Sequence, residues 1–313
     1  MSKIAKLACL TLAYPLFASA QTKAPAGTPV RITITLGHHY GQEPPALTRD
    51  DLVVTERFDP LPVTNLVPLR GDRAGLELYV LVDNCSNREP GSHFAELRRF
   101  VSSQPSTTAI GVAYIENGRL QVAEKPTQDH ERAVKALSTP AGSKPASPFI
   151  PLTELIQSWP QGSSRRAVLM ISNGIDPAAA DTLQATSAET AIEAAERAGV
   201  TVYAIYHPSA DYLASDPSKI YSGQVELAHL AVETGGEAYF LGFGPLPSLA
   251  PFLADVADHT ANQYLLEFVA DPSLDAGSFQ PVTVRSKIRD IELMTPSKVW
   301  VPAARKAGPT GEE

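Results

Sequence analysis

Polar side chains follow the most apolar strand-like segment of the chain. Residues 76–87 begin with an apolar run and end in the carboxylate of Asp83, the thiol of Cys85, the hydroxyl of Ser86 and the amide of Asn87. Such a run, bounded by polar residues, is typical of a strand that is buried on both faces of a sheet. In an open parallel sheet, ligands bind beyond the carboxyl ends of the strands. The four side chains therefore either form a binding site there or make a polar turn in which Asp83 caps the next helix.

Two later apolar segments also end in polar residues. Residues 167–172 are followed by Asn173 and Gly174, and residues 200–206 are followed by His207. Because the carboxyl ends of parallel strands meet at one edge of a sheet, we expect these residues to lie near Asp83 and its neighbours.

Cys85 offers a second kind of chemistry, because a thiol at the start of a helix can be a nucleophile when a base lies beside it. His207 is the candidate base, since it ends another strand on the same edge. The alternative is that Cys85 is a small buried residue in the place of a serine. The chain has no G-x-G-x-x-G after a strand, no G-x-S-x-G and no H-E-x-x-H. We therefore predict a protein that is not an enzyme, with Cys85-dependent catalysis as the less favoured alternative.

Residues 75–262 alternate between strand-like and helix-like segments. Short links between such segments predict an α/β fold with a doubly wound, mainly parallel sheet and helices on both faces. The pair Asn117-Gly118 is a hairpin signal and predicts one antiparallel strand in that sheet. The expected strands are 76–83, 107–115, 120–122, 167–172, 200–206 and 237–241, and the expected helices are 91–104, 129–137, 149–159, 188–198, 225–234 and 246–259.

The two flanks of this region read as strands without helices. Residues 30–36 alternate strictly between apolar and polar side chains, the pattern of a half-buried strand. We expect residues 21–74 to hold a leader and a small β element, with a turn at Asp59-Pro60. We expect the strands of residues 263–302 to pack with that element, because the termini of a domain often lie close together. Residues 303–313 are predicted to be a disordered tail. The expected flanking strands are 30–36, 52–56, 63–67, 264–269, 281–286, 289–294 and 299–301.

Residues 1–20 have the pattern of a secretory signal peptide. Two lysines precede a short apolar stretch, which ends in Ala18-Ser19-Ala20. We expect cleavage after Ala20 and a secreted or periplasmic protein. No other apolar run is long enough to span a membrane. Cleavage would remove two lysines and no acidic residue, and so change the formal charge from −8 to −10.

The composition after cleavage restricts the classes of partner. A chain this acidic is a poor candidate for binding nucleic acid or anionic lipid headgroups. Cys85 would be the one remaining cysteine, so an internal disulfide is excluded and the core must supply the stability. With 43% apolar and 19% charged residues, the chain has the composition of a globular protein.

The order of the elements and of their polar ends resembles a von Willebrand factor type A domain, over residues 75–262. In that family a metal-ion-dependent adhesion site is built from Asp-x-Ser-x-Ser, a loop threonine and a strand ending in Asp-Gly. The matching positions here are Asp83, Cys85 and Asn87, then Ser147 (or Ser143) for the threonine, and Asn173 before Gly174. The flanks resemble the secreted von Willebrand factor A-related proteins of acidobacteria.

This sequence departs from the family's metal pattern at most positions. A thiol is too soft a ligand for Mg²⁺, which requires oxygen ligands in near-octahedral order. Asn173 replaces a carboxylate by a neutral amide, and Asp176 is spaced wrongly to substitute for it directly. The resemblance therefore implies a degenerate adhesion site at Asp83, Cys85, Asn87, Ser147 and Asn173, with no cofactor or weakly bound Mg²⁺.

Two non-catalytic functions remain open on the sequence. The first is a secreted, adhesion-type module that binds another protein, with a partner that the sequence does not identify. The second is a structural or assembly subunit of the cell envelope. The enzyme that uses Cys85 is the third, less favoured function.

Overall fold

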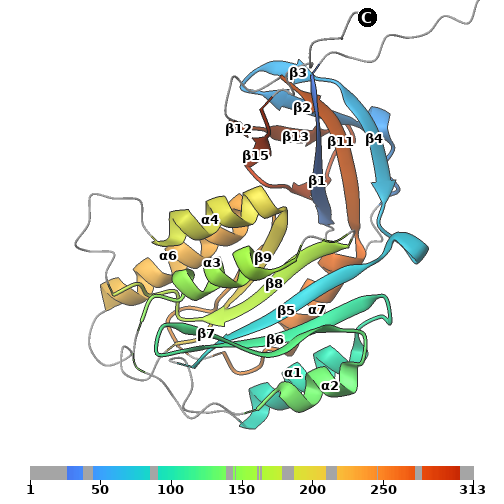
Figure 1. Ribbon diagram of the computed structural model, residues 1–313. Coiled ribbons are helices and arrows are strands. Elements are labelled where there is room, and N and C mark those ends of the chain that lie inside the picture. Colours follow the sequence, from blue (N-terminus) through green and yellow to red (C-terminus); the bar gives the residue numbers. More distant parts are fainter. Residues whose placement is uncertain are drawn as a thin grey trace, which may run out of the picture.

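The computed structural model describes residues 27–37, 45–84, 91–138, 144, 146–160, 162, 164–177, 187–208, 217–244, 246–271 and 277–303. Figure 1 shows two regions: an α/β region with helices on both sides of a sheet, and a β-rich region built from the two flanks of the sequence. Among the described helices, none has both the length and the apolar character needed to cross a membrane.

A six-stranded sheet organises the α/β region, with the strand order β10-β9-β8-β5-β6-β7. All neighbouring strands are parallel except β6 and β7, which are antiparallel. The chain first adds strands on one side of β5 and then returns to its other side with β8. The strands are β5 (Leu76–Asp83), β6 (Thr108–Glu116), β7 (Arg119–Thr127), β8 (Arg165–Ser172), β9 (Val200–Tyr206) and β10 (Ala238–Tyr239).

Helices cover both faces of this sheet (Figure 1). Leu78, Val80 and Val82 of β5 pack in one apolar core with α1 (Gly91–Ser103), α2 (His130–Ala136) and α7 (Ala250–Ala261). Tyr79 and Leu81 pack in a second core with α3 (Phe149–Ser158), α4 (Ser187–Ala198) and α6 (Pro217–Glu233). Successive side chains of a strand point to opposite faces of the sheet. An almost wholly apolar β5 therefore fits a sheet whose two faces are both covered by helices. The expected α/β fold with a mainly parallel sheet is confirmed.

The β-rich region combines strands from both flanks. Strand β1 pairs with β11 along eight residue pairs, from Thr28 opposite Ala270 to Thr35 opposite Gln263. Its apolar core includes Ile34, Leu36 and Phe268. The sheets are β14-β1-β11-β4, β13-β2-β3 and β12-β15. The strands are β1 (Thr28–Gly37), β2 (Leu52–Glu56), β3 (Asp59–Leu61), β4 (Val63–Pro68), β11 (Gln263–Ala270), β12 (Ser278–Pro281), β13 (Thr283–Ser286), β14 (Glu292–Met294) and β15 (Lys298–Val301), with 3-10 turns at Arg49–Asp51 and Gly71–Arg73.

Of the two turns predicted from the sequence, the structure confirms the one at Asn117-Gly118 and contradicts the one at Asp59-Pro60. Asn117 and Gly118 have φ values of 52° and 72° and join the antiparallel strands β6 and β7, as predicted. The turn predicted at Asp59-Pro60 is wrong, because both residues lie in β3. The chain turns just before it, where Arg57 adopts a φ of 55°. Pro60 is tolerated in β3 because this strand lies at the edge of its sheet.

Helix α6 begins at Pro217, earlier than the predicted start at residue 225. Proline is favoured in the first helical turn, where its missing N–H needs no acceptor. The added turns bury Ile220 and bring Gly223 against the loop after β8. The apolar periodicity was too weak over this stretch to reveal them.

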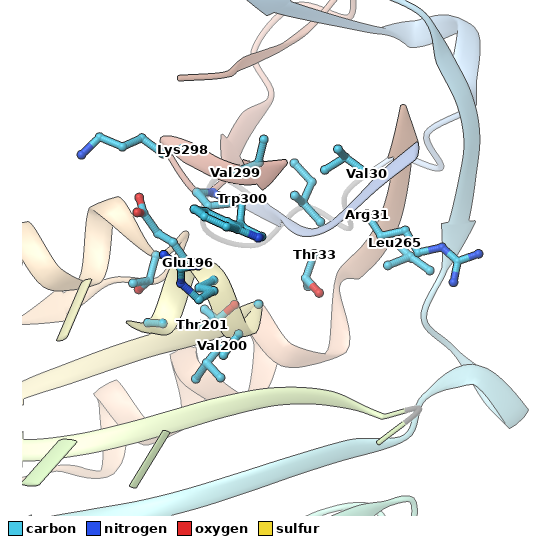
Figure 2. A pocket seen from close by; sticks show the side chains of 17 residues that line it. Val30, Arg31, Thr33, Glu196, Val200, Thr201, Leu265, Lys298, Val299 and Trp300 are labelled. Carbon is cyan, nitrogen blue, oxygen red and sulfur yellow. The ribbon is translucent and has the colours of Figure 1, made fainter. Parts of the chain in front are cut away.

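A cavity of about 260 Å³ lies where the two regions meet, lined by residues of α4, β1 and β15 (Figure 2). Glu196 of α4 is 8% exposed, and neither of its carboxylate oxygens has a hydrogen-bond partner in the described part of the chain. Burial raises the pKa of Glu196 from 4.5 to about 7, with the charge of Lys298 opposing the shift and Glu233, Glu193 and Glu189 adding to it. The folded protein therefore binds the Glu196 proton more tightly than the unfolded chain does.

The raised pKa of Glu196 predicts that the protein loses stability as the pH rises. Below pH 4.5 the carboxyl is protonated in both states, and between 4.5 and about 7 the unfolded chain releases the proton first. The loss is on the order of 3 kcal/mol. Glu196→Gln, which stays neutral, should raise the melting temperature at pH 8 by several degrees and leave it nearly unchanged at pH 4.5. The control is Glu193→Gln on the exposed side of the same helix; an equal effect of both variants, or one independent of pH, would contradict the prediction.

The pairing of β11 predicts that the C-terminal strands are needed for folding. Strand β11 is hydrogen-bonded to β1 on one side and to β4 on the other. Truncation after Asn262 would leave the apolar faces of both strands uncovered, and should cause aggregation or a clear drop in melting temperature. Truncation after Ala303, which keeps every described strand, is the control. A soluble Asn262 truncation as stable as the control would show that the tail is an independent appendage.

Candidate functional site

The carboxyl ends of β5 and β8 lie side by side at the point where the order of the strands reverses. Ligands of open α/β sheets bind at such a point. Asp83 ends β5 and is 1% exposed. Its Oδ2 accepts a 2.8 Å hydrogen bond from Oγ of Ser172, the last residue of β8. That same Oγ accepts a 3.1 Å bond from the backbone N–H of Gly174. A serine hydroxyl therefore links the buried carboxylate to the loop after β8.

Asn173 is oriented by its own loop. Its Oδ1 accepts a 2.8 Å hydrogen bond from the backbone N–H of Ile175, an arrangement typical of an Asx turn. Gly174 has a φ of +67°, and a Cβ at this position would lie 2.2 Å from the carbonyl oxygen of Gly223 in α6. Two glycines thus allow α6 to pack directly against the loop. The amide oxygen that would replace the family's carboxylate already serves to hold this turn.

Ser147 belongs to a second group of polar side chains, just before α3. Its Oγ lies 2.8 Å from Oγ of Ser187, and Ser187 in turn donates to the carboxylate of Asp176. The structure therefore connects Ser147 with Asp176 through Ser187, a residue that the sequence did not single out. The other candidates, Cys85, Asn87 and the alternative Ser143, lie outside the described residues.

Two further polar residues at this edge, Asn84 and His93, were not singled out at the sequence level. Asn84 is 1% exposed; its Nδ2 donates a 2.9 Å bond to Oε1 of Glu116, while its Oδ1 is buried without a partner in the described chain. His93 of α1 lies 3.1 Å from the carbonyl oxygen of Leu246 through Nε2, and its ring meets that of His207 edge-on at 5.3 Å. Asn84 directly follows Asp83, so the sequence could have identified it as part of the polar end of β5. No sequence motif pointed to His93, because its contacts with Leu246 and His207 form only in the folded chain.

The described candidates fit Mg²⁺ poorly. The ion requires several oxygens that converge in near-octahedral order and a site with enough negative charge to replace its water. Here Asp83 accepts from Ser172, Asn173 accepts from its own loop, and Ser147 is bonded to Ser187. Each of the three candidates thus makes a hydrogen bond within the protein, and no chemical step through a metal follows from them.

The nucleophile hypothesis gains no support from the described residues. His207 is 9% exposed and packs beside His93, and Cys85 lies outside the described part. Tyr206 ends the same strand, and burial raises its pKa to about 12. This phenol therefore stays protonated at neutral pH and is no general base.

Exposed apolar side chains gather on the same edge of the sheet, at its β10 side. Tyr221 and Val225 lie one turn apart on α6, and Phe240, Leu241 and Phe243 follow β10; we call these five residues the α6 patch. They are 63%, 45%, 41%, 60% and 49% exposed, respectively. Nε2 of Gln224 donates a 2.6 Å bond to the carbonyl oxygen of Gly242 and so fixes the segment after β10 to α6. Grouped apolar side chains of this kind mark interaction surfaces more often than isolated ones do.

Comparison with known proteins gives likenesses of fold. No protein-family model and no curated protein matches the chain. Among solved structures, proximal thread matrix protein 1 from the mussel byssus has 16% identity and a TM-score of 0.41, and covers 60% of this chain, which spans 48% of that protein. The vWF domain of the type V pili tip protein Mfa5 from Porphyromonas gingivalis has 9% identity and a TM-score of 0.43, over 58% of this chain and 94% of that domain. The three N-terminal domains of Mfa5 have 10% identity and a TM-score of 0.43, over 90% of this chain and 68% of that structure. The α/β region itself has a mainly parallel six-stranded sheet with helices on both faces.

Proposed function

We propose that the protein is an exported, non-catalytic module that binds another protein at the carboxyl edge of its parallel sheet. The observation that carries this proposal is the α6 patch, in which five large apolar side chains are between 41% and 63% exposed. Burying apolar surface of this kind drives protein association. Gln224 fixes the segment after β10 in place, so a partner meets an ordered surface with little further loss of chain entropy.

The polar candidates support binding rather than catalysis. Asp83, Asn173 and Ser147 are held by Ser172, Ile175 and Ser187. In this proposal the adhesion site is degenerate, and these contacts stiffen the loops at the carboxyl edge of the sheet. The partner then makes its contacts without a bridging metal ion.

Export is part of the same proposal. Residues 1–20 combine a basic start, a short apolar stretch and the small residues Ala18 and Ala20 at the end. A formal charge of −10 after cleavage favours a partner with a neutral or basic surface.

Affinity capture with a matched pair of variants tests the binding function. The mature protein should capture a defined partner from its own envelope fraction, equally with and without chelator. Leu241→Asp with Phe243→Asp should reduce capture at least tenfold, because a charge in an apolar contact is desolvated without a counter-ion. Phe58→Asp is the control, because Phe58 is 95% exposed on the β-rich region.

Three outcomes of the capture would contradict the proposal. A partner lost on chelation would show that binding depends on a metal ion. Equal capture by the patch variant and the wild type would place the interface elsewhere. Turnover of a substrate that depends on Cys85 would support the alternative hypothesis that the protein is an enzyme.

The degenerate site predicts that millimolar Mg²⁺ leaves the melting temperature of the wild type nearly unchanged. Cys85→Ser with Asn173→Asp restores a hydroxyl and a carboxylate and should create a Mg²⁺-dependent rise. An ion at about a hundredfold excess over its Kd would contribute roughly 2.7 kcal/mol. The aspartate can keep the bond from the Ile175 N–H, so the loop should tolerate the change. A large Mg²⁺ shift of the wild type that Asp83→Ala abolishes would show that the site is intact.

A further inference from the structure

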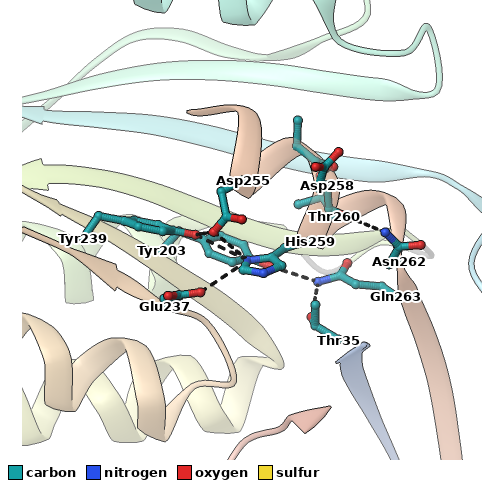
Figure 3. A network of polar contacts seen from close by, with 11 residues as sticks. Thr35, Tyr203, Glu237, Tyr239, Asp255, Asp258, His259, Thr260, Asn262 and Gln263 are labelled. Atoms are coloured by element: carbon teal, nitrogen blue, oxygen red, sulfur yellow. Dashed lines mark hydrogen bonds and ion pairs between the residues drawn. The ribbon is translucent and has the colours of Figure 1, made fainter. Parts of the chain in front are cut away.

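Four polar side chains converge at the other end of the sheet, near the β-rich region (Figure 3). Glu237 directly precedes β10, and Tyr239 lies in that strand. Asp255 and His259 lie one turn apart on α7 and so share a face of that helix. His259 is buried, with 7% of its side chain exposed, whereas Glu237 and Asp255 are 45% and 40% exposed. The cluster therefore combines the buried imidazole of His259 with two carboxylates that solvent reaches.

Three oxygens of the described residues approach the same ring nitrogen of His259. Nδ1 lies 3.7 Å from Oε2 of Glu237, 3.7 Å from Oδ2 of Asp255 and 3.3 Å from the hydroxyl of Tyr239. A ring nitrogen carries at most one hydrogen, so it cannot satisfy three oxygens. The two carboxylates also stand beyond hydrogen-bond distance from it. The arrangement leaves room between the three ligand atoms, which lie within 4.8 Å of one another.

His229 shows what an ordinary imidazole between two acids looks like in this protein. Its Nδ1 faces Glu189 at 3.7 Å, and its Nε2 faces Glu233 at 3.8 Å. Each nitrogen of a protonated ring can donate to one carboxylate, so this arrangement suits an ion-pair bridge. At His259 both carboxylates face the same nitrogen, Nδ1. A cation bound between Nδ1 and the two carboxylates would satisfy all three groups.

We infer that His259 Nδ1 and the carboxylates of Asp255 and Glu237 bind a divalent transition-metal ion, with Zn²⁺ as its representative. Imidazole nitrogen with carboxylate oxygen is a ligand set suited to Zn²⁺. Metal–ligand bonds of about 2.0–2.1 Å give a tetrahedron with edges of about 3.4 Å. The distances of 3.7 Å from His259 Nδ1 to the Glu237 and Asp255 oxygens need to shorten by only a few tenths of an ångström. Water supplies the fourth ligand.

Tyr239 is the positioning residue of this site. Its hydroxyl donates a 2.8 Å hydrogen bond to Oδ2 of Asp255 and so orients that carboxylate toward His259. Such contacts to the ligands of a metal commonly change its affinity by about 10–100-fold. The bound ion would join the start of β10 to α7, and α7 leads through Asn262 into β11 of the β-rich region. The ion therefore acts as a clamp beside the junction of the two regions.

Calorimetric titration of the full, metal-stripped chain with ZnCl₂ tests the site. We expect one Zn²⁺ per chain and a rise in melting temperature with Zn²⁺. Glu237→Gln and Asp255→Asn should each weaken binding at least about tenfold, and Tyr239→Phe should weaken it while one ion still binds. Both acids are half-exposed, so their variants should fold even if His259→Gln does not. The visible spectrum of bound Co²⁺ should report four-coordination.

Two controls make the result specific. His229→Gln removes the ordinary imidazole bridge, and Asp83→Asn removes the carboxylate at the opposite edge; both should bind Zn²⁺ as the wild type does. Absence of binding to the wild type would overturn the inference, as would wild-type affinity in both carboxylate variants. Loss of binding in His229→Gln or Asp83→Asn would place the ion elsewhere and would overturn it as well.

Discussion

The burial of β5 on both faces is the constraint on which the rest of this structure depends. Leu78, Val80 and Val82 face one apolar core, and Tyr79 and Leu81 face the other. With strands on both sides, the backbone of β5 is fully paired along the sheet, so polar chemistry is confined to its ends. Asp83 is the first residue at which the chain leaves this environment, and its carboxylate is held at once by Ser172 of the neighbouring strand.

The same constraint leaves the carboxyl edge of the sheet with polar groups held within the protein and apolar groups exposed to solvent. Ser172 and the Asx turn of Asn173 satisfy buried polar groups within the protein, and Gly174 and Gly223 bring α6 directly against that loop. Helix α6 then supports the segment after β10 through Gln224. The polar part of the edge is thus committed internally, and the α6 patch presents the apolar part to solvent.

The sequence was a good guide where one local pattern dictates the structure. The apolar run of β5 and the Asn117-Gly118 turn led to the right sheet, because strand burial and hairpin geometry leave few alternatives. It was a poor guide to pairs of residues far apart in the chain. Ser172 could be recognised as a strand end but not as the donor to Asp83. His93 and His207 lie far apart in the sequence, and their rings meet only in the folded chain. The convergence of Glu237 and Asp255 on His259 likewise exists only after α7 docks on β10, so no motif announces it.

The junction of the two regions holds one buried polar group without a hydrogen-bond partner in the described chain and one that bridges the regions. The carboxylate of Glu196 is buried there without a hydrogen-bond partner, and Gln263 of β11 donates to both Thr35 of β1 and the hydroxyl of Tyr203 in β9. A buried, unpaired carboxylate costs stability, whereas the amide of Gln263 bridges the two regions. Ionisation of Glu196 therefore makes this junction sensitive to pH.

The central claim is that a partner protein docks on the α6 patch without help from a metal ion. Hydrogen–deuterium exchange on the complex with the captured partner measures this directly, by comparing amide protection with and without chelator. The account predicts new protection over α6 and residues 240–244, of equal size in both conditions. Protection confined to the loops after β5 and β8, and lost on chelation, would contradict it.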